Sequence, residues 1–240
     1  MEKIFITKDQ LQKLDIIGSG KEGTVYEYDK HTAIKIFNNE VNLDSKMKKI
    51  YLLHDTPIQF FATIPEKLID TPNVNGYSME YKKGYLALSE LKQLSNKRKI
   101  ELLKQAKVVL EAFHKEHKIV VGDVRCENIL AKDNHIVFCD TDNFKINNIN
   151  PELLNIYGKY YVRKYNVFDE GLDIFSFNIM SLFFLFNCSK QEIVDYILNT
   201  EEISNVNIRN MFMRVLNDEK FRRNYIIDDL LANKTKRKLY

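Results

Sequence analysis

Three polar side chains with complementary chemistry occur within six consecutive residues, from Asp123 to Asn128. Asp123 can orient a hydroxyl group and accept its proton, and Arg125 can neutralise a phosphate group. Asn128 offers a carbonyl oxygen to a hard cation such as Mg²⁺, which prefers oxygen ligands and often shares itself with substrate phosphates. One short segment is a modest signal, so its meaning depends on the elements that would position it.

A second candidate metal ligand follows twelve residues after Asn128. The apolar segment Ile136–Cys139 predicts a strand, and Asp133-Asn134 predicts the turn before it. Asp140 then stands at the end of that strand, as Asn128 stands at the end of a loop. Two oxygen ligands placed in this way predict a Mg²⁺ site.

A glycine-rich segment near the N-terminus contains Gly18, Gly20 and Gly23. β-Branched and aromatic residues on both sides predict a strand, a turn and a second strand. Glycines at this spacing let backbone amides approach a polyphosphate without side-chain obstruction. A hairpin turn without a ligand is the simpler interpretation. Because the following segment is strand-like and not helical, the pattern argues against a dinucleotide-binding fold.

A lysine interrupts the next predicted strand, Thr32–Phe37. In strict alternation Lys35 shares a face with Ala33 and Phe37, where a strand normally buries carbon. Two interpretations remain open. Lys35 is either an edge-strand lysine whose charged end reaches water, or a cation that holds nucleotide phosphates.

These motifs together resemble the protein kinase superfamily, from about Leu14 to the C-terminus. The resemblance implies an α+β, two-lobed protein kinase-like fold. Residues 1–81 would form a small N-lobe with an antiparallel sheet, and residues 82–240 a mainly helical C-lobe. The residues that carry the resemblance are the glycine segment with Val25-Tyr26, the strand residues Ala33-Ile34-Lys35, the loop residues Asp123, Glu127 and Asn128, and the aspartates Asp140 and Asp173.

The resemblance also implies roles for individual residues. Asp123, Arg125 and Lys35 would be catalytic, and Asn128 and Asp140 would bind Mg²⁺. The residues implied to surround ATP are Gly18, Ser19, Gly20, Lys21, Gly23, Val25, Ala33, Lys35, Met79, Glu80 and Tyr81. Asp173 would be structural and would accept backbone hydrogen bonds from the catalytic loop. His114 is expected to be a packed or capping residue and not a ligand.

Several positions depart from the family pattern. The predicted helix Val41–His54 lacks the glutamate that pairs with the strand lysine, and Asp44 or Glu40 are the available substitutes. The triplet after the second strand reads Asp140-Thr141-Asp142, so Asp142 either ligates a second metal or caps the next turn. Because Val121 and Gly122 replace the usual His and Arg, activation is not expected to depend on a phosphorylated loop residue.

The remaining segments are predicted mainly by hydrophobic periodicity. The expected elements are helices at Tyr85–Leu94, Lys99–Glu116, Asp173–Phe186, Asn205–Leu216 and Tyr225–Asn233, a hairpin within Phe61–Tyr81 with its turn at Pro72–Gly76, and a capping box at Ser189–Glu192. The resemblance further implies an activation segment at Asn143–Asn166.

The composition limits the class of protein. The chain has 240 residues, 45% of them hydrophobic, and a net charge of +3. These values suit a cytoplasmic globular protein and give no case for nucleic-acid binding. The longest apolar run, Ile174–Cys188, is interrupted by polar residues and is too short to span a membrane. We expect a monomer or a weak dimer.

The favoured hypothesis is an ATP- and Mg²⁺-dependent phosphotransferase that acts on Ser/Thr of an unidentified protein substrate. One alternative is a small-molecule kinase, because Val121-Gly122-Asp123 resembles such enzymes and the usual A-P-E signature is absent. Another is a pseudokinase that serves as a binding or scaffold module, because the helix glutamate and the usual glycine triplet are missing.

Overall fold

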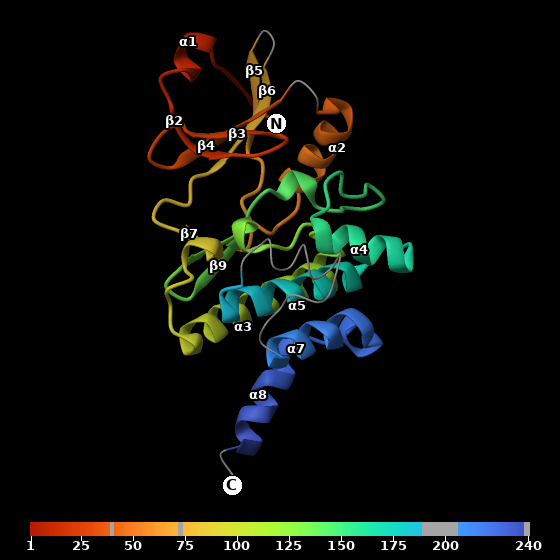
Figure 1. Ribbon diagram of the computed structural model, residues 1–240. Helices are drawn as coiled ribbons and strands as arrows, with labels where there is room; N and C mark the ends of the chain where they lie inside the picture. The colour runs from red at the N-terminus through yellow and green to blue at the C-terminus, as the bar shows by residue number, and fades with distance from the viewer. Residues whose placement is uncertain (39–40, 72–73, 189–205, 238–240) are drawn as a thin grey trace. The chain divides into compact units, whose positions relative to one another are not determined.

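The computed structural model describes residues 1–38, 41–71, 74–188 and 206–237 (Figure 1). Within these ranges the protein is α+β, as predicted, with seven α-helices, a six-stranded mixed sheet and a three-stranded sheet. The chain divides into two compact units. The first contains Met1–Tyr85 and Val137–Asp142, and the second contains Leu86–Ile136 and Asn143–Tyr240.

The first unit is built on the six-stranded sheet, which has the order β1-β5-β6-β4-β3-β2. The strands are β1 (Lys3–Phe5), β2 (Asp15–Ser19), β3 (Gly23–Glu27), β4 (Thr32–Phe37), β5 (Lys67–Thr71) and β6 (Val74–Glu80). The strand–turn–strand prediction around the glycines is confirmed, and β4 has the predicted bounds. The sheet was predicted to be antiparallel and is mixed, because β1 pairs with β5 in parallel while its other strand pairs are antiparallel.

Apolar residues on both faces of the sheet explain why it forms a core. One face packs together Ala33, Phe37, Ile50, Leu68, Tyr77 and Met79, and the other packs together Ile6, Ile34, Ile36 and Ile69. Ile50 comes from helix α2 (Leu43–His54), which begins where the Asn42 side chain accepts a hydrogen bond from the Ser45 amide. The short helix α1 (Lys8–Leu11) begins at Thr7 with a capping box.

The returning strand of the predicted hairpin begins earlier than expected, at Val74. Gly76 therefore lies inside the ladder, opposite Ile36 and Ile69, and not in the turn. A β-carbon at Gly76 would strike the backbone carbonyl of Lys35, so the close approach of β4 and β6 requires glycine here. Pro72 and Asn73 lie outside the described residues.

The second unit is mainly helical. Its helices are α3 (Asn96–Ala112), α4 (Ile156–Tyr165), α5 (Glu170–Phe186), α7 (Val206–Asn217) and α8 (Ile226–Arg237). Every residue of α5 from Gly171 to Leu182 is buried. The apolar run Ile179–Phe186 was expected to be buried all round, but Phe183 and Phe186 are half-buried. The second sheet has the order β7-β8-β9, with β7 (Leu86–Ala87), β8 (Ile129–Lys132) and β9 (His135–Phe138).

Three of the predicted elements differ from the structure. The prediction of a helix at Tyr85–Leu94 was wrong. Leu86–Ala87 is a strand that pairs with β8, and only Leu88–Glu90 forms a 3₁₀ turn. The segment Asn143–Asn166 contains α4, whose start is fixed by Asn155 accepting a hydrogen bond from the Gly158 amide. The helix expected at Lys99–Glu116 begins earlier, because Ser95 caps it, and it ends in a π-helical turn, Phe113–His117. The predicted capping box Ser189–Glu192 lies outside the described residues.

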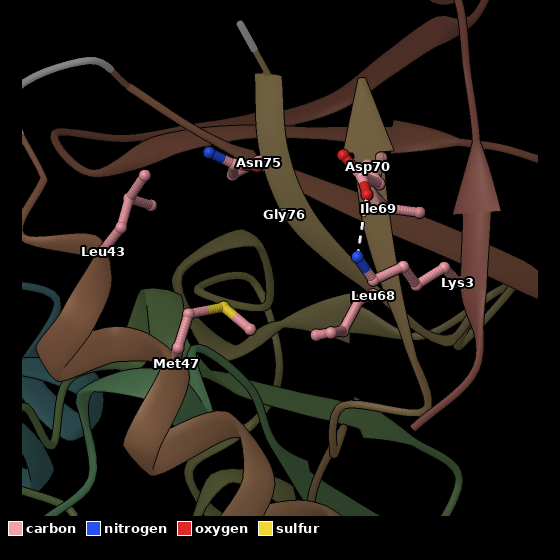
Figure 2. A pocket seen from close by; sticks show the side chains of 8 residues that line it. All are labelled: Lys3, Leu43, Met47, Leu68, Ile69, Asp70, Asn75 and Gly76. Atoms are coloured by element: carbon pink, nitrogen blue, oxygen red, sulfur yellow. Dashed lines mark hydrogen bonds and ion pairs between the residues drawn. The ribbon is translucent and has the colours of Figure 1, made fainter. Parts of the chain in front are cut away.

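The described helices include none that is both long and apolar enough to cross a membrane. The first unit has a cavity of about 210 Å³ where α2 meets β5 and β6 (Figure 2). Leu43 and Met47 of α2 face it, and an ion pair of 2.9 Å between Lys3 and Asp70 lies at its edge. None of the predicted site residues lines this cavity.

Candidate functional site

Lys35 lies at the centre of a buried charge cluster in the first unit. It stands on β4 between Val25 of β3 and Tyr77 of β6, and it is 4% exposed. Its ammonium group binds the carboxylates of Asp140 and Asp142, and the Asp142 contact measures 2.6 Å. The predicted position of Lys35 on the core face is confirmed, and its charge is neutralised inside the protein instead of reaching water.

A second buried lysine extends this cluster. Lys46 of α2 lies 2.9 Å from Asp142 and 2.8 Å from Glu22, which precedes Gly23 in the glycine-rich turn. The Tyr77 hydroxyl donates a further hydrogen bond of 2.7 Å to Asp142. Carboxylates and ammonium groups therefore alternate along one row of ion pairs, in the order Glu22, Lys46, Asp142, Lys35 and Asp140.

In this row of ion pairs, the neighbouring charges favour the charged forms of Lys35 and Asp142. Burial by itself disfavours the charged Lys35, but Asp142 and Asp140 outweigh burial and raise the pKa of Lys35 above its usual value. Burial likewise opposes the charged Asp142, but Lys35 and Lys46 outweigh it and hold the Asp142 pKa well below 3.8. At Glu22, the first residue of the row, burial has the larger effect and raises the pKa even though Lys46 lowers it.

The structure corrects the sequence-based choice of a partner for Lys35. Asp44 is exposed on the first turn of α2, and the carboxylates that meet Lys35 belong to Asp140 and Asp142. Glu40 lies outside the described residues. Asp142 sits in a 3₁₀ turn, Thr141–Asn143, and its carboxylate binds two lysines instead of capping the turn.

The low pKa of Asp142 gives the first testable prediction. Asp142 contributes to stability above its ordinary pKa of 3.8, and this contribution is lost as the pH falls below that value. Below pH 3.8 the unfolding free energy of the wild type should fall with an extra slope of up to about 1.4 kcal/mol per pH unit, which Asp142→Asn removes. Urea titrations from pH 6 to pH 3 measure both slopes. Parallel curves for the two proteins would contradict the assignment.

Asp140 is the member of the cluster with the most accessible carboxylate, at 28% exposure of its side chain. Its backbone has a φ of 61°, a left-handed conformation that aspartate tolerates better than most residues. Oxygen atoms of Glu22, Asp140 and Asp142 lie within 4.8 Å of one another. Hard oxygen donors of this kind suit Mg²⁺, and Asp140 is best placed to supply one because it is the least buried of the three.

The glycine-rich turn between β2 and β3 is closed by a hydrogen bond of 2.9 Å from the Gly20 amide to the Gly23 carbonyl. Ser19, Gly20 and Lys21 are exposed, and Gly18 and Val25 are half-buried. A β-carbon at Gly23 would strike the Ile36 carbonyl, whereas one at Gly20 would meet open space. Strand packing therefore explains Gly23, but it does not explain Gly20.

This contrast predicts different results for two alanine substitutions. Gly23→Ala should destabilise the protein by about 1 to 3 kcal/mol, because the β-carbon forces β3 away from β4. Gly20→Ala should change the unfolding free energy by less than about 0.5 kcal/mol, and should weaken nucleotide binding if the turn covers phosphates. Urea unfolding and nucleotide titration of both variants measure the two effects. Equal destabilisation by both substitutions would contradict the steric argument.

The remaining residues predicted to surround ATP belong to the same unit, where Ala33, Met79 and Glu80 lie on neighbouring strands and Tyr81 follows β6. Ala33 pairs with Met79 in the β4–β6 ladder, and both are buried. Glu80 ends β6 and is exposed, and its carboxylate lies 2.7 Å from the Lys82 ammonium group. The Tyr81 amide donates a hydrogen bond of 2.7 Å to the His31 carbonyl. These contacts fix the backbone that follows β6.

The second unit contains the other polar cluster predicted from the sequence. Asp123 is buried, and Arg125 Nε lies 3.1 Å from its carboxylate. Asn128, in the 3₁₀ turn Cys126–Asn128, donates hydrogen bonds of 3.0 Å to the backbone carbonyl and the carboxylate of Asp123. Because the amide nitrogen makes both bonds, the Asn128 side-chain oxygen remains a candidate metal ligand.

Asp173 of α5 supports the backbone just before this cluster. Its carboxylate accepts hydrogen bonds of 2.7 Å from the amides of Val121 and Gly122, and His114 Nε2 lies 2.8 Å away. The predicted structural role of Asp173 is confirmed, and His114 is a buried packing residue as expected. Gly122 has a φ of 78°, and a β-carbon there would strike Pro151, so glycine is required for this turn.

The structure thus brings the predicted residues together in two groups. Lys35, Asp140 and the glycine-rich turn belong to the first unit, and Asp123, Arg125 and Asn128 belong to the second. Sequence reasoning missed Lys46, Glu22 and Tyr77. A buried lysine on an amphipathic helix has no local signal, because the carboxylates that neutralise it are 24 and 96 positions away.

Neither the protein-family models nor the curated protein sequences contain a match to this chain.

Proposed function

We propose that this protein is an ATP- and Mg²⁺-dependent phosphotransferase with a two-lobed protein kinase-like fold, and that it phosphorylates Ser or Thr of a protein. The observation that carries the proposal is the pairing of Lys35 with Asp140. A lysine on a core strand is held by the aspartate proposed to bind the metal, 105 positions away. Phosphoryl transfer needs cations that hold phosphates and a carboxylate that holds metal.

Each step of such a reaction has a chemically competent residue. Lys35 would bind the α- and β-phosphates beneath the Gly18–Gly23 turn, and Asp123 would orient the attacking hydroxyl and accept its proton. Arg125 would stabilise charge on the γ-phosphate. Asn128 and Asp140 would hold Mg²⁺, which when bound neutralises charge on the phosphate oxygens.

A cavity in the second unit supports a protein acceptor over a metabolite. It measures about 210 Å³, and its lining includes Arg125, Tyr157, Met180 and Phe183. Pockets that enclose a whole small molecule usually measure about 300 to 1,000 Å³. A cavity of this size suits one side chain of a polypeptide better than a complete metabolite. The small-molecule kinase remains the alternative enzyme.

The second candidate function is a binding or scaffold module without catalysis. It is favoured by one observation, namely that both Asp140 and Asp142 already neutralise Lys35. A catalytic role requires Lys35 to bind phosphate in place of at least one of them. The presence of Lys35, Asp123, Asn128 and Asp140 together favours the enzyme.

Incubation with ATP labelled at the γ-phosphate, together with Mg²⁺, separates these functions. We expect label to appear in a generic protein substrate, and Asp123→Asn and Lys35→Ala to abolish the transfer. Nucleotide binding without transfer would favour the scaffold. Turnover only in the presence of a metabolite pool would identify a small-molecule kinase.

A further inference from the structure

We propose that Asp142 is the positioning residue for Lys35 and that Lys46 anchors Asp142, so that a cation on α2 replaces the missing helix glutamate. This inference rests on the proposed function for its catalytic consequence. Its structural content, however, concerns only the first unit and can be tested without any activity.

The contacts of Asp142 divide between its two oxygens. Oδ1 lies 2.6 Å from Lys35 Nζ and accepts the 2.7 Å hydrogen bond from Tyr77, whereas Oδ2 lies 2.9 Å from Lys46 Nζ. Asp142 is fully buried, and so is Lys46. Because one oxygen contacts Lys35 and the other contacts Lys46, Asp142 cannot rotate without weakening its ion pairs with two buried ammonium groups at once.

The other carboxylate at Lys35 is less constrained. Asp140 is partly exposed and is the proposed metal ligand, so a bound cation would compete with Lys35 for it. Asp142 would still hold the ammonium group when Asp140 turns to the metal. The two aspartates therefore have different roles: Asp142 holds the Lys35 ammonium group, and Asp140 is available to bind the metal ion.

Lys46 also connects the ion pair of Asp142 and Lys35 to the glycine-rich turn. Its ammonium group contacts Glu22 at 2.8 Å and the Asp142 backbone carbonyl at 3.3 Å. Asn38 strengthens the same connection, because its backbone amide donates a hydrogen bond of 2.9 Å to the backbone carbonyl of Glu22. Lys46 therefore links α2 both to the turn and to the segment after β9.

A double-mutant cycle tests the charge inversion. Lys46→Glu alone should reduce kcat/KM most, because it places a third carboxylate beside Glu22 and Asp142. Asp142→Asn should reduce it less. In the double variant the carboxylate introduced on α2 can pair with Lys35, so kcat/KM should recover at least about tenfold relative to Lys46→Glu. A double variant whose loss equals the product of the two single losses would overturn the proposal.

Chemical labelling of lysines provides a readout that does not depend on catalysis. We expect Asp142→Asn to raise acylation of Lys35 several-fold, as mapped by mass spectrometry, while the buried Lys49 and Lys99 stay unlabelled. Asp44→Asn, which neutralises an exposed acid on α2, is the matched control and should leave Lys35 protected. If the wild type transfers no phosphate, the proposed function fails, yet this labelling still decides whether Asp142 positions Lys35.

Two labelling results would overturn the positioning role. The first is unchanged protection of Lys35 in Asp142→Asn. The second is equal labelling of Lys35, Lys49 and Lys99 in both Asp142→Asn and the double variant, because general exposure would make the network a structural requirement only.

Discussion

Asp123→Asn is expected to lower kcat for phosphoryl transfer by about 10²- to 10⁴-fold, the range for loss of a general base. Asparagine keeps the size of the side chain and an oxygen that can accept the 3.0 Å hydrogen bond from Asn128. It cannot accept a proton from the attacking hydroxyl. The fold and the affinity for ATP should therefore persist while turnover is lost. Steady-state kinetics with labelled ATP, together with nucleotide titration, measure both quantities.

Asp133→Asn is the matched control for this experiment. Asp133 is an exposed acid between β8 and β9, and its φ of 50° is one that asparagine also adopts readily. Its neutralisation should leave kcat unchanged. If Asp123→Asn retained more than about a tenth of the wild-type kcat, Asp123 would not be the base.

Asp173→Ala is expected to have the largest effect on stability. The substitution leaves the buried amides of Val121 and Gly122 and the His114 ring without the acceptor that they share. Loss of such a buried charged acceptor should cost about 3 to 5 kcal/mol of unfolding free energy. Urea unfolding monitored by circular dichroism measures the change.

Ser181→Ala on the same helix is the control for Asp173→Ala. Ser181 is also fully buried in α5, so the substitution tests the effect of altering a buried polar side chain. It should change the unfolding free energy by less than about 1 kcal/mol. A similar loss of unfolding free energy in the two variants would mean that the hydrogen bonds of Asp173 stabilise the protein no more than other buried polar contacts of α5.

The parts of the fold that were predictable are those with a strong local pattern. Alternation placed β4 at Thr32–Phe37 and placed Lys35 on the same face as Ala33 and Phe37. The mostly apolar run Ile179–Phe186 indicated a buried helix, and most of α5 is buried. The hydrogen bonds of Asp173 to the backbone near Asp123 were implied by the resemblance of Asp173–Asn178 to a family motif, and the structure shows two of them, from Val121 and Gly122.

Other features depend on partners distant in sequence, and local patterns do not reveal them. Strand β1 is only three residues long and forms because it pairs with β5, more than 60 positions away. Leu86–Ala87 belongs to a sheet and not to the expected helix, because β8 supplies its partner. Lys46 has the sequence context of an exposed helical lysine, and only the distant Glu22 and Asp142 make its burial possible.

The most direct test of the proposed phosphotransferase is to measure ATP binding and γ-phosphate transfer in the same sample, with Mg²⁺ and a protein acceptor. We predict that the wild type binds ATP and transfers label, and that Lys35→Ala loses both. We also predict that Asp123→Asn binds ATP but transfers at least about 10²-fold more slowly. ATP binding by the wild type with no transfer to any acceptor, or transfer that survives in Asp123→Asn, would contradict the proposed function.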